Sequence, residues 1–300
     1  EIRLSLVGSE MCIRDSRRLA VLMLCGLVAG CGWWLIYRFG RPLISVTQAV
    51  QDPAARMPAK TTLAHALLQI ITVGLGSPLG REVAPREVGA LAASGVSAWL
   101  RLPADQHRLI VACGAGAGLA AVYNVPLGAA LFVLEVLLGT FAWPAAAVAL
   151  VTCCIGAVIA WIGLGNEIQY AVPPMTAGAS LIVWAAVAGP LFGIAAQGFV
   201  QLTSAARRQA ARGWRLPVAA FVNFTLIGVL AIFLPALLGN GKGPAQLGFS
   251  SELTLGMAAL LLVLKVAITS GSLRAGASGG LLTPGTVSYT HLTLPTNREV

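Results

Sequence analysis

Charged residues are scarce in this sequence, and that scarcity largely decides its class. Only 10% of the 300 residues are Asp, Glu, Lys or Arg, whereas 57% are hydrophobic. Average soluble domains carry about 25% charged residues, so a water-soluble globule is excluded. The sequence predicts an all-α polytopic membrane protein, and its 34 Gly and 16 Pro are typical of tightly packed, broken helices rather than simple spans.

Motifs for metal, disulfide or nucleophilic chemistry are also missing. The six Cys are scattered and form no CxxC pair, and neither an HExxH sequence nor a Ser/His/Asp arrangement occurs. We therefore expect no cofactor and no enzyme activity. The net charge of +9 is typical of basic cytoplasmic loops and anionic headgroups, or indicates an anionic substrate. The basic residues form no stripe with interleaved aromatics, which argues against nucleic-acid binding.

Apolar runs divide the chain into membrane segments of unequal length. The runs cover 19–39, 63–79, 88–100, 109–122, 126–139, 144–164, 178–203, 217–238 and 253–269. Several are shorter than the roughly 20 residues that a span needs. Half-spanning helices are tolerated where their ends are buried in protein or face a water-filled cavity. The Gly- and Pro-interrupted stretches 74–90 and 271–285 therefore predict a binding site near the midplane, without a close sequence repeat between them.

Both ends of the chain differ abruptly from what they adjoin. Residues 1–16 and 287–300 resemble translated sequencing-adapter sequence. Such segments are excluded from fold reasoning. We expect the membrane domain to cover 17–286 and the natural protein to extend beyond both ends.

The first group of residues with functional chemistry is Gly80-Arg81-Glu82-Val83-Ala84-Pro85. A carboxylate within a membrane is costly and indicates function. Pro85 suits the first turn of a helix, and a helix that begins near Glu82 directs free N–H groups and a positive dipole end at one spot, which favours an anion. Glu82 would occupy that spot when ionised and leave it when protonated, as a gate does. The alternative is structural ion pairing, of Arg81 with Glu82 or of Arg86 with Glu87.

The second group is the segment 276–284, GASGGLLTP. Its small residues allow tight turns that leave the amides of Leu281 and Leu282 free to donate. A nest of amides binds anions without a charged side chain. The alternative is a glycine-rich joint for helix packing.

Other features permit simpler interpretations. The run 114–120, GAGAGLA, predicts close helix packing, and Asn124 is expected to cap the helix that follows it. Glu135, alone in an apolar run, is either a buried proton relay or a satisfied structural carboxyl. We expect His65 to be a packed neutral residue and Lys265 to reach toward the membrane interface.

Taken in order, these motifs resemble those of the CLC family of chloride channels and chloride/proton exchangers. The GREGP motif of the family matches residues 80–84, its GAAAGLAAAFNAPLAG run matches 114–128, and its GxFxP motif matches 280–284. Order and spacing agree across about 19–286. The resemblance implies a homodimer with one pore per subunit, built from inverted halves of tilted, broken helices. It implies that Glu82 is the external gate and that amides near Leu281 and Leu282 belong to the central anion site.

The departures from the family pattern affect function. The serine motif GSGIP falls on 40–44, where Arg41 replaces the serine, and GREGP has become GREVA. Leu282 replaces the Phe of GxFxP. The relay glutamate of the exchangers, second in an adjacent pair, is replaced by Val136 after Glu135. The late tyrosine of the family is absent, so we expect a fold that is incomplete at the C-terminus.

These features together predict transport of chloride or a similar monovalent anion, passive or weakly proton-coupled. One alternative is a proton-coupled antiporter with Glu135 as relay, and another is a non-conducting fragment or a membrane enzyme or sensor. The residues predicted to contact the anion are Gly80, Arg81, Glu82, Val83, Gly280, Leu281, Leu282 and Arg41. The expected dimer interface lies in 178–203 and 217–238, the expected location is a bacterial inner membrane, and ion selectivity stays open.

Overall fold

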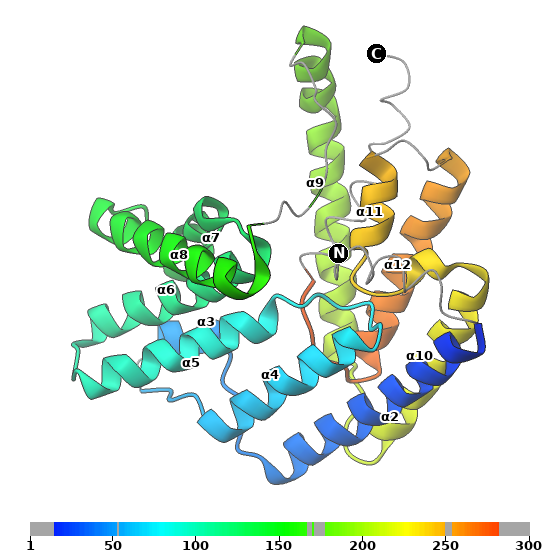
Figure 1. Cartoon of the computed structure of the whole chain (residues 1–300), viewed down its shortest axis with the longest axis horizontal. Coiled ribbons are helices and arrows are strands. Elements are labelled where there is room, and N and C mark those ends of the chain that lie inside the picture. The colour runs from blue at the N-terminus through cyan, green and yellow to red at the C-terminus, as the bar shows by residue number, and fades with distance from the viewer. Residues whose placement is uncertain (1–14, 53, 167–169, 171–177, 250–253, 282–300) are drawn as a thin grey trace. The chain divides into compact units, whose positions relative to one another are not determined.

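The computed structural model describes residues 15–52, 54–166, 170, 178–249 and 254–281. Within those ranges the secondary structure is helical, and the extended pairing is confined to one isolated bridge. The α-helices are α2 (Asp15–Phe39), α3 (Val46–Gln51), α4 (Ala59–Gly74), α5 (Val83–Trp99), α6 (Ala104–Tyr123), α7 (Pro126–Phe132), α8 (Trp143–Leu164), α9 (Ala179–Arg208), α10 (Arg215–Phe233), α11 (Lys242–Phe249) and α12 (Leu255–Arg274) (Figure 1). A π-helix, η1 (Val133–Leu138), follows α7, and a 3₁₀ turn, η2 (Pro235–Leu237), follows α10.

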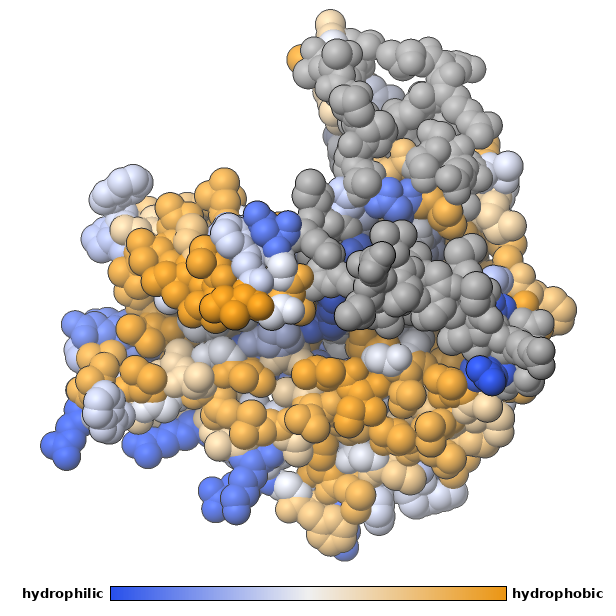
Figure 2. Space-filling view, in the orientation of Figure 1, coloured by the Kyte–Doolittle hydropathy of each residue, from blue (hydrophilic) through white to orange (hydrophobic). Residues whose placement is uncertain are grey.

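Five of these helices are long and apolar enough to cross a membrane, namely α2, α8, α9, α10 and α12. Their outward side chains are apolar: on α8, Ile159 is 60% and Ile162 88% exposed. Figure 2 shows broad hydrophobic areas over the described helices. The all-α polytopic membrane class is thereby confirmed, and most of the predicted runs coincide with a helix. The short helices α3 and α11 were not predicted.

The chain divides into two compact units that are interleaved in sequence. Unit 1 consists of residues 1–34, 72–80 and 170–300, and unit 2 of 35–71 and 81–169. In unit 1, α12 packs against α9 and α10. Gly26 and Gly30 of α2 lie against α10, where an added Cβ on Gly30 would be 2.6 Å from the Cα of Pro217. Small residues thus permit close approach of these helices, as expected for packing inside a membrane.

Unit 2 is organised around α6, which contacts α5, α7, α8 and α3. Its core is built largely of Ala, Val, Leu and Cys side chains. Gly116 packs against Val133 and Cys153, and Gly156 of α8 packs against the backbone of Ala117. The predicted small-residue packing of 114–120 is therefore confirmed, and it fixes the end of α6, where Tyr123 lies.

Candidate functional site

Two non-helical segments, which we call breaks, interrupt the helices near the predicted site. The first break separates α4 from α5. Gly76 has a φ of +98°, and its N–H donates to Val73 O at 3.0 Å while Ser77 N–H donates to Thr72 O at 3.1 Å. This pair of bonds is the Schellman pattern that ends many helices, and it needs the left-handed conformation that glycine adopts without strain. Gly239 N–H donates to Gly76 O at 3.1 Å and ties the break to the loop after η2.

The second break, after α12, repeats the same turn. Gly276 has a φ of +93°, its N–H donates to Leu273 O at 3.1 Å, and Ala277 N–H donates to Ser272 O at 3.0 Å. Positions in the two breaks correspond at a constant offset of 200 residues, 76 with 276 and 77 with 277. The sequence shows no close repeat here, so the symmetry lies in the backbone.

An antiparallel bridge joins the two breaks within unit 1. Gly80 N–H donates to Gly280 O at 2.8 Å, and Gly280 N–H donates to Gly80 O at 2.9 Å, again at the offset of 200 residues. The bridge uses the N–H groups of both glycines, so these two predicted anion contacts serve the backbone pairing. Gly279 packs against its counterpart Leu79, and an added Cβ would be 2.6 Å from the Cβ of Leu79.

Two contacts from the region around the end of α9 hold the second break. The Nη2 of Arg207 donates to Gly279 O at 3.0 Å, and Ala211 N–H donates to Arg274 O at 2.8 Å. Gly276 lies against Leu216 at the start of α10. Sequence reasoning missed Arg207, because it lies in a basic segment that carries no motif and forms the last turn of α9.

Glu82 is the N-cap residue of α5 and is fully buried, with 0% exposure. The hydroxyl of Tyr123, the last residue of α6, donates to Glu82 Oε2 at 2.9 Å. The prediction that a helix begins directly after Glu82 is confirmed. A carboxylate at a helix N-terminus lies where the helix dipole and the first free N–H groups favour negative charge.

Close packing of α5 on α6 brings Tyr123 to Glu82. A Cβ on Gly118 of α6 would collide with the carbonyl of Pro85, and one on Gly89 would collide with that of Gly114. Larger residues at these positions would separate the helices. The small-residue run of α6 therefore positions the hydroxyl that contacts the carboxylate, and that run was the only signal in the sequence for Tyr123.

Two arginines lie close to this carboxylate. Arg81 donates from Nη2 to Val122 O at 3.4 Å and lies 5.9 Å from the centre of the Tyr123 ring. Arg86 lies 5.3 Å from the centre of the Phe132 ring and interacts electrostatically with both Glu82 and Glu87. The start of α5 thus combines a buried carboxylate with positive charge.

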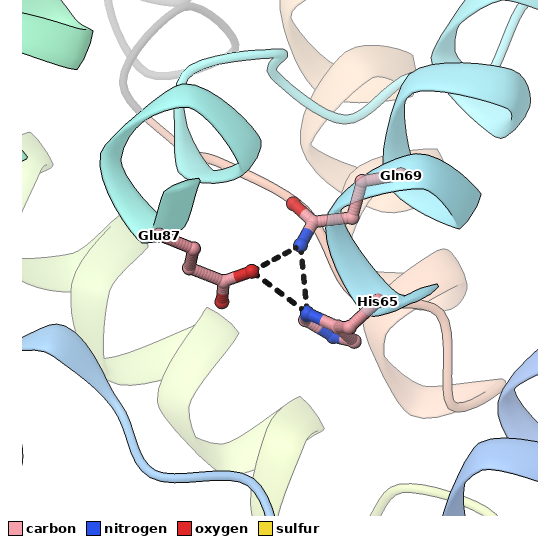
Figure 3. A network of polar contacts seen from close by, with 3 residues as sticks. All are labelled: His65, Gln69 and Glu87. Atoms are coloured by element: carbon pink, nitrogen blue, oxygen red, sulfur yellow. Dashed lines mark hydrogen bonds and ion pairs between the residues drawn. The ribbon is translucent and has the colours of Figure 1, made fainter. Parts of the chain in front are cut away.

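A second buried polar group links α4 to α5. His65 Nδ1 lies 2.9 Å from Glu87 Oε2, and Gln69 Nε2 lies 2.9 Å from His65 Nδ1 and 3.1 Å from Glu87 Oε2 (Figure 3). The side chains of His65 and Glu87 are only 7% and 13% exposed. Glu87 thus contacts His65 directly and interacts electrostatically with Arg86, and the prediction that His65 is simply a packed residue was incomplete.

The remaining predicted site residues divide between the two units, with Arg41, Val83 and Glu135 in unit 2 and Leu281 in unit 1. Arg41 is exposed, and its backbone N–H donates to Thr61 Oγ1 at 3.2 Å. Glu135 lies on η1 and is exposed, so the expectation of a buried acid is not met in this chain. Val83 opens α5 and Leu281 follows the bridge, whereas Leu282 lies outside the described residues.

Two further expectations were wrong. Lys265 does not reach an interface; it is 2% exposed, and its ammonium donates to the carbonyls of Leu237 and Gly239. Asn124 does not cap the helix after it; it ends α6 in the left-handed conformation, with φ +56°. Its side-chain oxygen accepts from Trp161 Nε1 at 2.8 Å. In the described part of the chain, no group of three or more His, Cys, Asp or Glu could hold a metal ion.

Comparison with known proteins identifies sequence relatives over most of the chain. The family model described as "Voltage gated chloride channel" matches residues 24–287. The voltage-gated ClC-type chloride channel ClcB of Shigella flexneri is 31% identical, over 93% of this chain and 68% of its own length. The protein of the same name from Escherichia coli O81 is 30% identical, with the same coverage. The chain thus spans about two thirds of the length of these relatives.

Solved structures agree with the fold. A slow cyanobacterial Cl⁻/H⁺ antiporter superposes with a TM-score of 0.77 at 20% identity, covering 97% of this chain and 73% of its own. A CLC-type fluoride/proton antiporter superposes with a TM-score of 0.75 at 22% identity, covering 93% and 72%. At these identities the similarity establishes the fold alone, which is the bundle of broken helices that the sequence predicts.

Proposed function

Because the chain belongs to the voltage-gated chloride channel family, we propose that it carries chloride or a similar monovalent anion across the membrane, with Glu82 as the gate. A member of this family is an integral membrane transport protein and not an enzyme. The observation that carries the proposal is the fully buried carboxylate of Glu82 at the N-terminus of α5. Such a carboxylate occupies the position that an anion would otherwise take.

The proposal assigns anion contacts to backbone amides. At the start of α5 these are the N–H groups around Arg81, Glu82 and Val83, at the positive end of the helix dipole. After the second break they are the amides of Leu281 and Leu282. Gly80 and Gly280 were expected to contact the anion, but they are assigned no contact because their N–H groups form the bridge. Arg41 is assigned no contact, since it is exposed and bonded to Thr61.

Gating follows from the two protonation states of Glu82. When ionised, Glu82 accepts the hydrogen bond of Tyr123 and fills the anion position at the start of α5. When protonated, it loses the charge that the helix dipole and Arg86 stabilise, and the position becomes available to the permeant anion. Anion flux should therefore increase as the pH falls.

Proton coupling separates two forms of this proposal. Val136, which cannot carry a proton, led us to expect passive or weakly coupled transport. Both solved structures with the matching fold are described as proton antiporters, and this favours the proton-coupled alternative, with Glu135 as relay.

The test is simultaneous recording of anion and proton flux from liposomes that contain the purified full chain. Coupled exchange predicts proton movement in fixed ratio to anion movement, which Glu135→Gln abolishes while anion flux continues. Anion flux without proton movement would establish the passive form. If the wild-type chain carries no anion, the non-conducting alternative replaces the proposal.

Assembly and location complete the proposal. We assign the protein to a bacterial inner membrane, because the relatives named above come from bacteria. A homodimer is expected, with α9 and α10 as the first helices to test by cysteine cross-linking. Both present exposed apolar side chains, such as Ile194 at 72% and Val222 at 60%.

A further inference from the structure

The contact between His65 and Glu87 depends on where the protons lie. The bare imidazole nitrogen and the carboxylate oxygen are both hydrogen-bond acceptors. Their separation of 2.9 Å is a hydrogen-bond distance, so Nδ1 donates to Oε2 when it carries a hydrogen, whereas a bare Nδ1 accepts from Gln69 Nε2, which is also 2.9 Å away. Gln69 supplies a second donor, because its Nε2 is 3.1 Å from the same carboxylate oxygen.

The pair can exist in two charge states that differ by one proton. With neutral His65 and ionised Glu87, the net charge of the pair is −1. Uptake of one proton, by the bare ring nitrogen of His65 or by the carboxylate of Glu87, brings the net charge to zero. The uptake breaks one O–H bond of a hydronium ion and forms one N–H or O–H bond, and release to water reverses it. Burial favours the neutral total, since charge is costly away from water.

Arg86 connects this pair electrostatically to the gate. Its guanidinium interacts with Glu87, with Glu82 and with Tyr123. The charged and titratable groups identified around the pair are thus Arg86 and Glu82 on α5 and Tyr123 on α6. On α4, Lys60 is exposed at the start of the helix, and α3, which also packs on α5, has the uncharged sequence VTQAVQ. Neutralising Glu87 leaves Glu82 as the remaining carboxylate neighbour of Arg86.

We infer that His65, Gln69 and Glu87 form a second proton-binding site, whose occupancy changes the electrostatic potential at Glu82, because the charge of the pair offsets that of the neighbouring Arg86. The ligand is a proton, and the residues involved are distinct from the gate and from Glu135. The link to gating rests on the proposed function; the proton site itself does not. Protons would then act on transport at two places, directly at Glu82 and indirectly through Glu87.

The proton site is tested by ¹⁵N NMR of the full chain, labelled at histidine and held in lipid nanodiscs. The sequence has three His, and His65→Gln identifies the signals of His65 by their loss. Glu87→Gln keeps the size and hydrogen-bonding capacity of the side chain but removes its charge. We expect His65 to require an approximately tenfold higher proton concentration for half-protonation in this variant.

A matched control is present in the same spectrum. The Nδ1 of His107 lies 2.8 Å from the Oγ of Ser97, a neutral partner, so its titration should stay unchanged in Glu87→Gln. Asp105→Asn removes an exposed carboxylate from α6 and should leave the titration of His65 unchanged. A His65 signal that does not titrate, or that titrates identically in wild type and Glu87→Gln, would overturn the proton site.

The link to the gate is tested by the pH profile of anion flux. Glu87→Gln should shift the proton concentration at half-maximal flux by about threefold or more, whereas Asp105→Asn should not. In the Glu82→Gln background, adding Glu87→Gln should have no further effect. An unshifted profile would refute the link while the NMR result stands, and a chain without anion flux would refute the proposed function without altering the titration.

Discussion

The two breaks at 74–80 and 274–280 share a backbone pattern, but the residues that follow them differ in chemistry. Each ends a helix with the same turn, at Gly76 or Gly276, and the two meet in the bridge between Gly80 and Gly280. After the bridge, the first break is followed by Arg81 and Glu82, and the second by Leu281 and Leu282. The same bridge is thus followed in sequence by a titratable residue in one copy and by uncharged residues in the other. The comparison shows that the backbone sets the position and the side chains decide the role.

The helices before the breaks differ in the same way. His65 of α4 and Lys265 of α12 occupy corresponding positions at the offset of 200 residues, and both are buried. His65, an imidazole that can gain or lose a proton, contacts the side chains of Gln69 and Glu87. Lys265 donates to two backbone carbonyls and has a structural role. His65 is therefore relevant to function, and Lys265 is relevant to stability.

The largest loss of stability is expected beside the bridge, where Leu79 and Gly279 pack together and leave room for one large side chain. Gly279→Leu would place a second leucine against Leu79, and such overpacking costs about 3 kcal/mol. We expect a strongly lowered thermal unfolding midpoint in detergent. The exchange double variant Leu79→Gly/Gly279→Leu should recover part of the loss, since it restores one large and one small residue. Additive losses in this double-mutant cycle would contradict the symmetry of the two breaks.

A smaller loss of stability is expected from Lys265→Met. The change keeps an apolar side chain of similar length but leaves the carbonyls of Leu237 and Gly239 without their charged donor, which costs about 2 kcal/mol. Thermal unfolding measures the loss. Lys60→Met, at an exposed position on α4, is the control and should change the midpoint little. Equal effects of the two substitutions would mean that Lys265 is not held as described.

Tyr123→Phe tests the hydrogen bond from Tyr123 to Glu82, the residue that follows the first break. Removing the hydroxyl deprives Glu82 of a hydrogen bond to its charged form, worth about 1.5 kcal/mol. Glu82 should then take up a proton more readily, and the half-maximal anion flux should move toward neutral pH by about tenfold in proton concentration. Tyr37→Phe, at an exposed tyrosine of α2, is the control. An unchanged flux profile would separate Tyr123 from the gate.

The smallest difference is expected between the two turn glycines. Alanine costs about 1 kcal/mol at either position, because both φ angles are positive. At Gly76 the nearest atom to an added Cβ is 3.7 Å away, whereas at Gly276 it is Leu216 Cγ at 2.9 Å. Gly276→Ala should therefore lower the unfolding midpoint more than Gly76→Ala does. The reverse order would mean that the second break is the less crowded one.

The sequence was sufficient to predict most helices and the positions of both breaks. Long apolar runs mark the spans, glycines mark the turns, and Pro85 marks the beginning of α5. These signals are local in sequence, so their structural consequences can be predicted without tertiary information. The buried position of Glu82 also follows from them.

Contacts between distant residues could not be predicted in this way. Tyr123 is 41 residues from Glu82, and Glu87 is 22 residues from His65, so no spacing rule connects them. The offset of 200 residues is invisible because corresponding positions carry different residues, such as Leu79 and Gly279. Lys265 was placed wrongly because carbonyl acceptors, which no side chain marks, make its burial possible.

The central claim, that Glu82 gates anion transport, is tested most directly with Glu82→Gln. Anion flux from liposomes is recorded at acid and at neutral pH for wild type and variant, with Asp105→Asn as a control at an exposed carboxylate. The account predicts that wild-type flux rises at acid pH, and that the variant conducts equally at both pH values because its gate is permanently uncharged. A variant that retains the wild-type pH dependence would contradict the account.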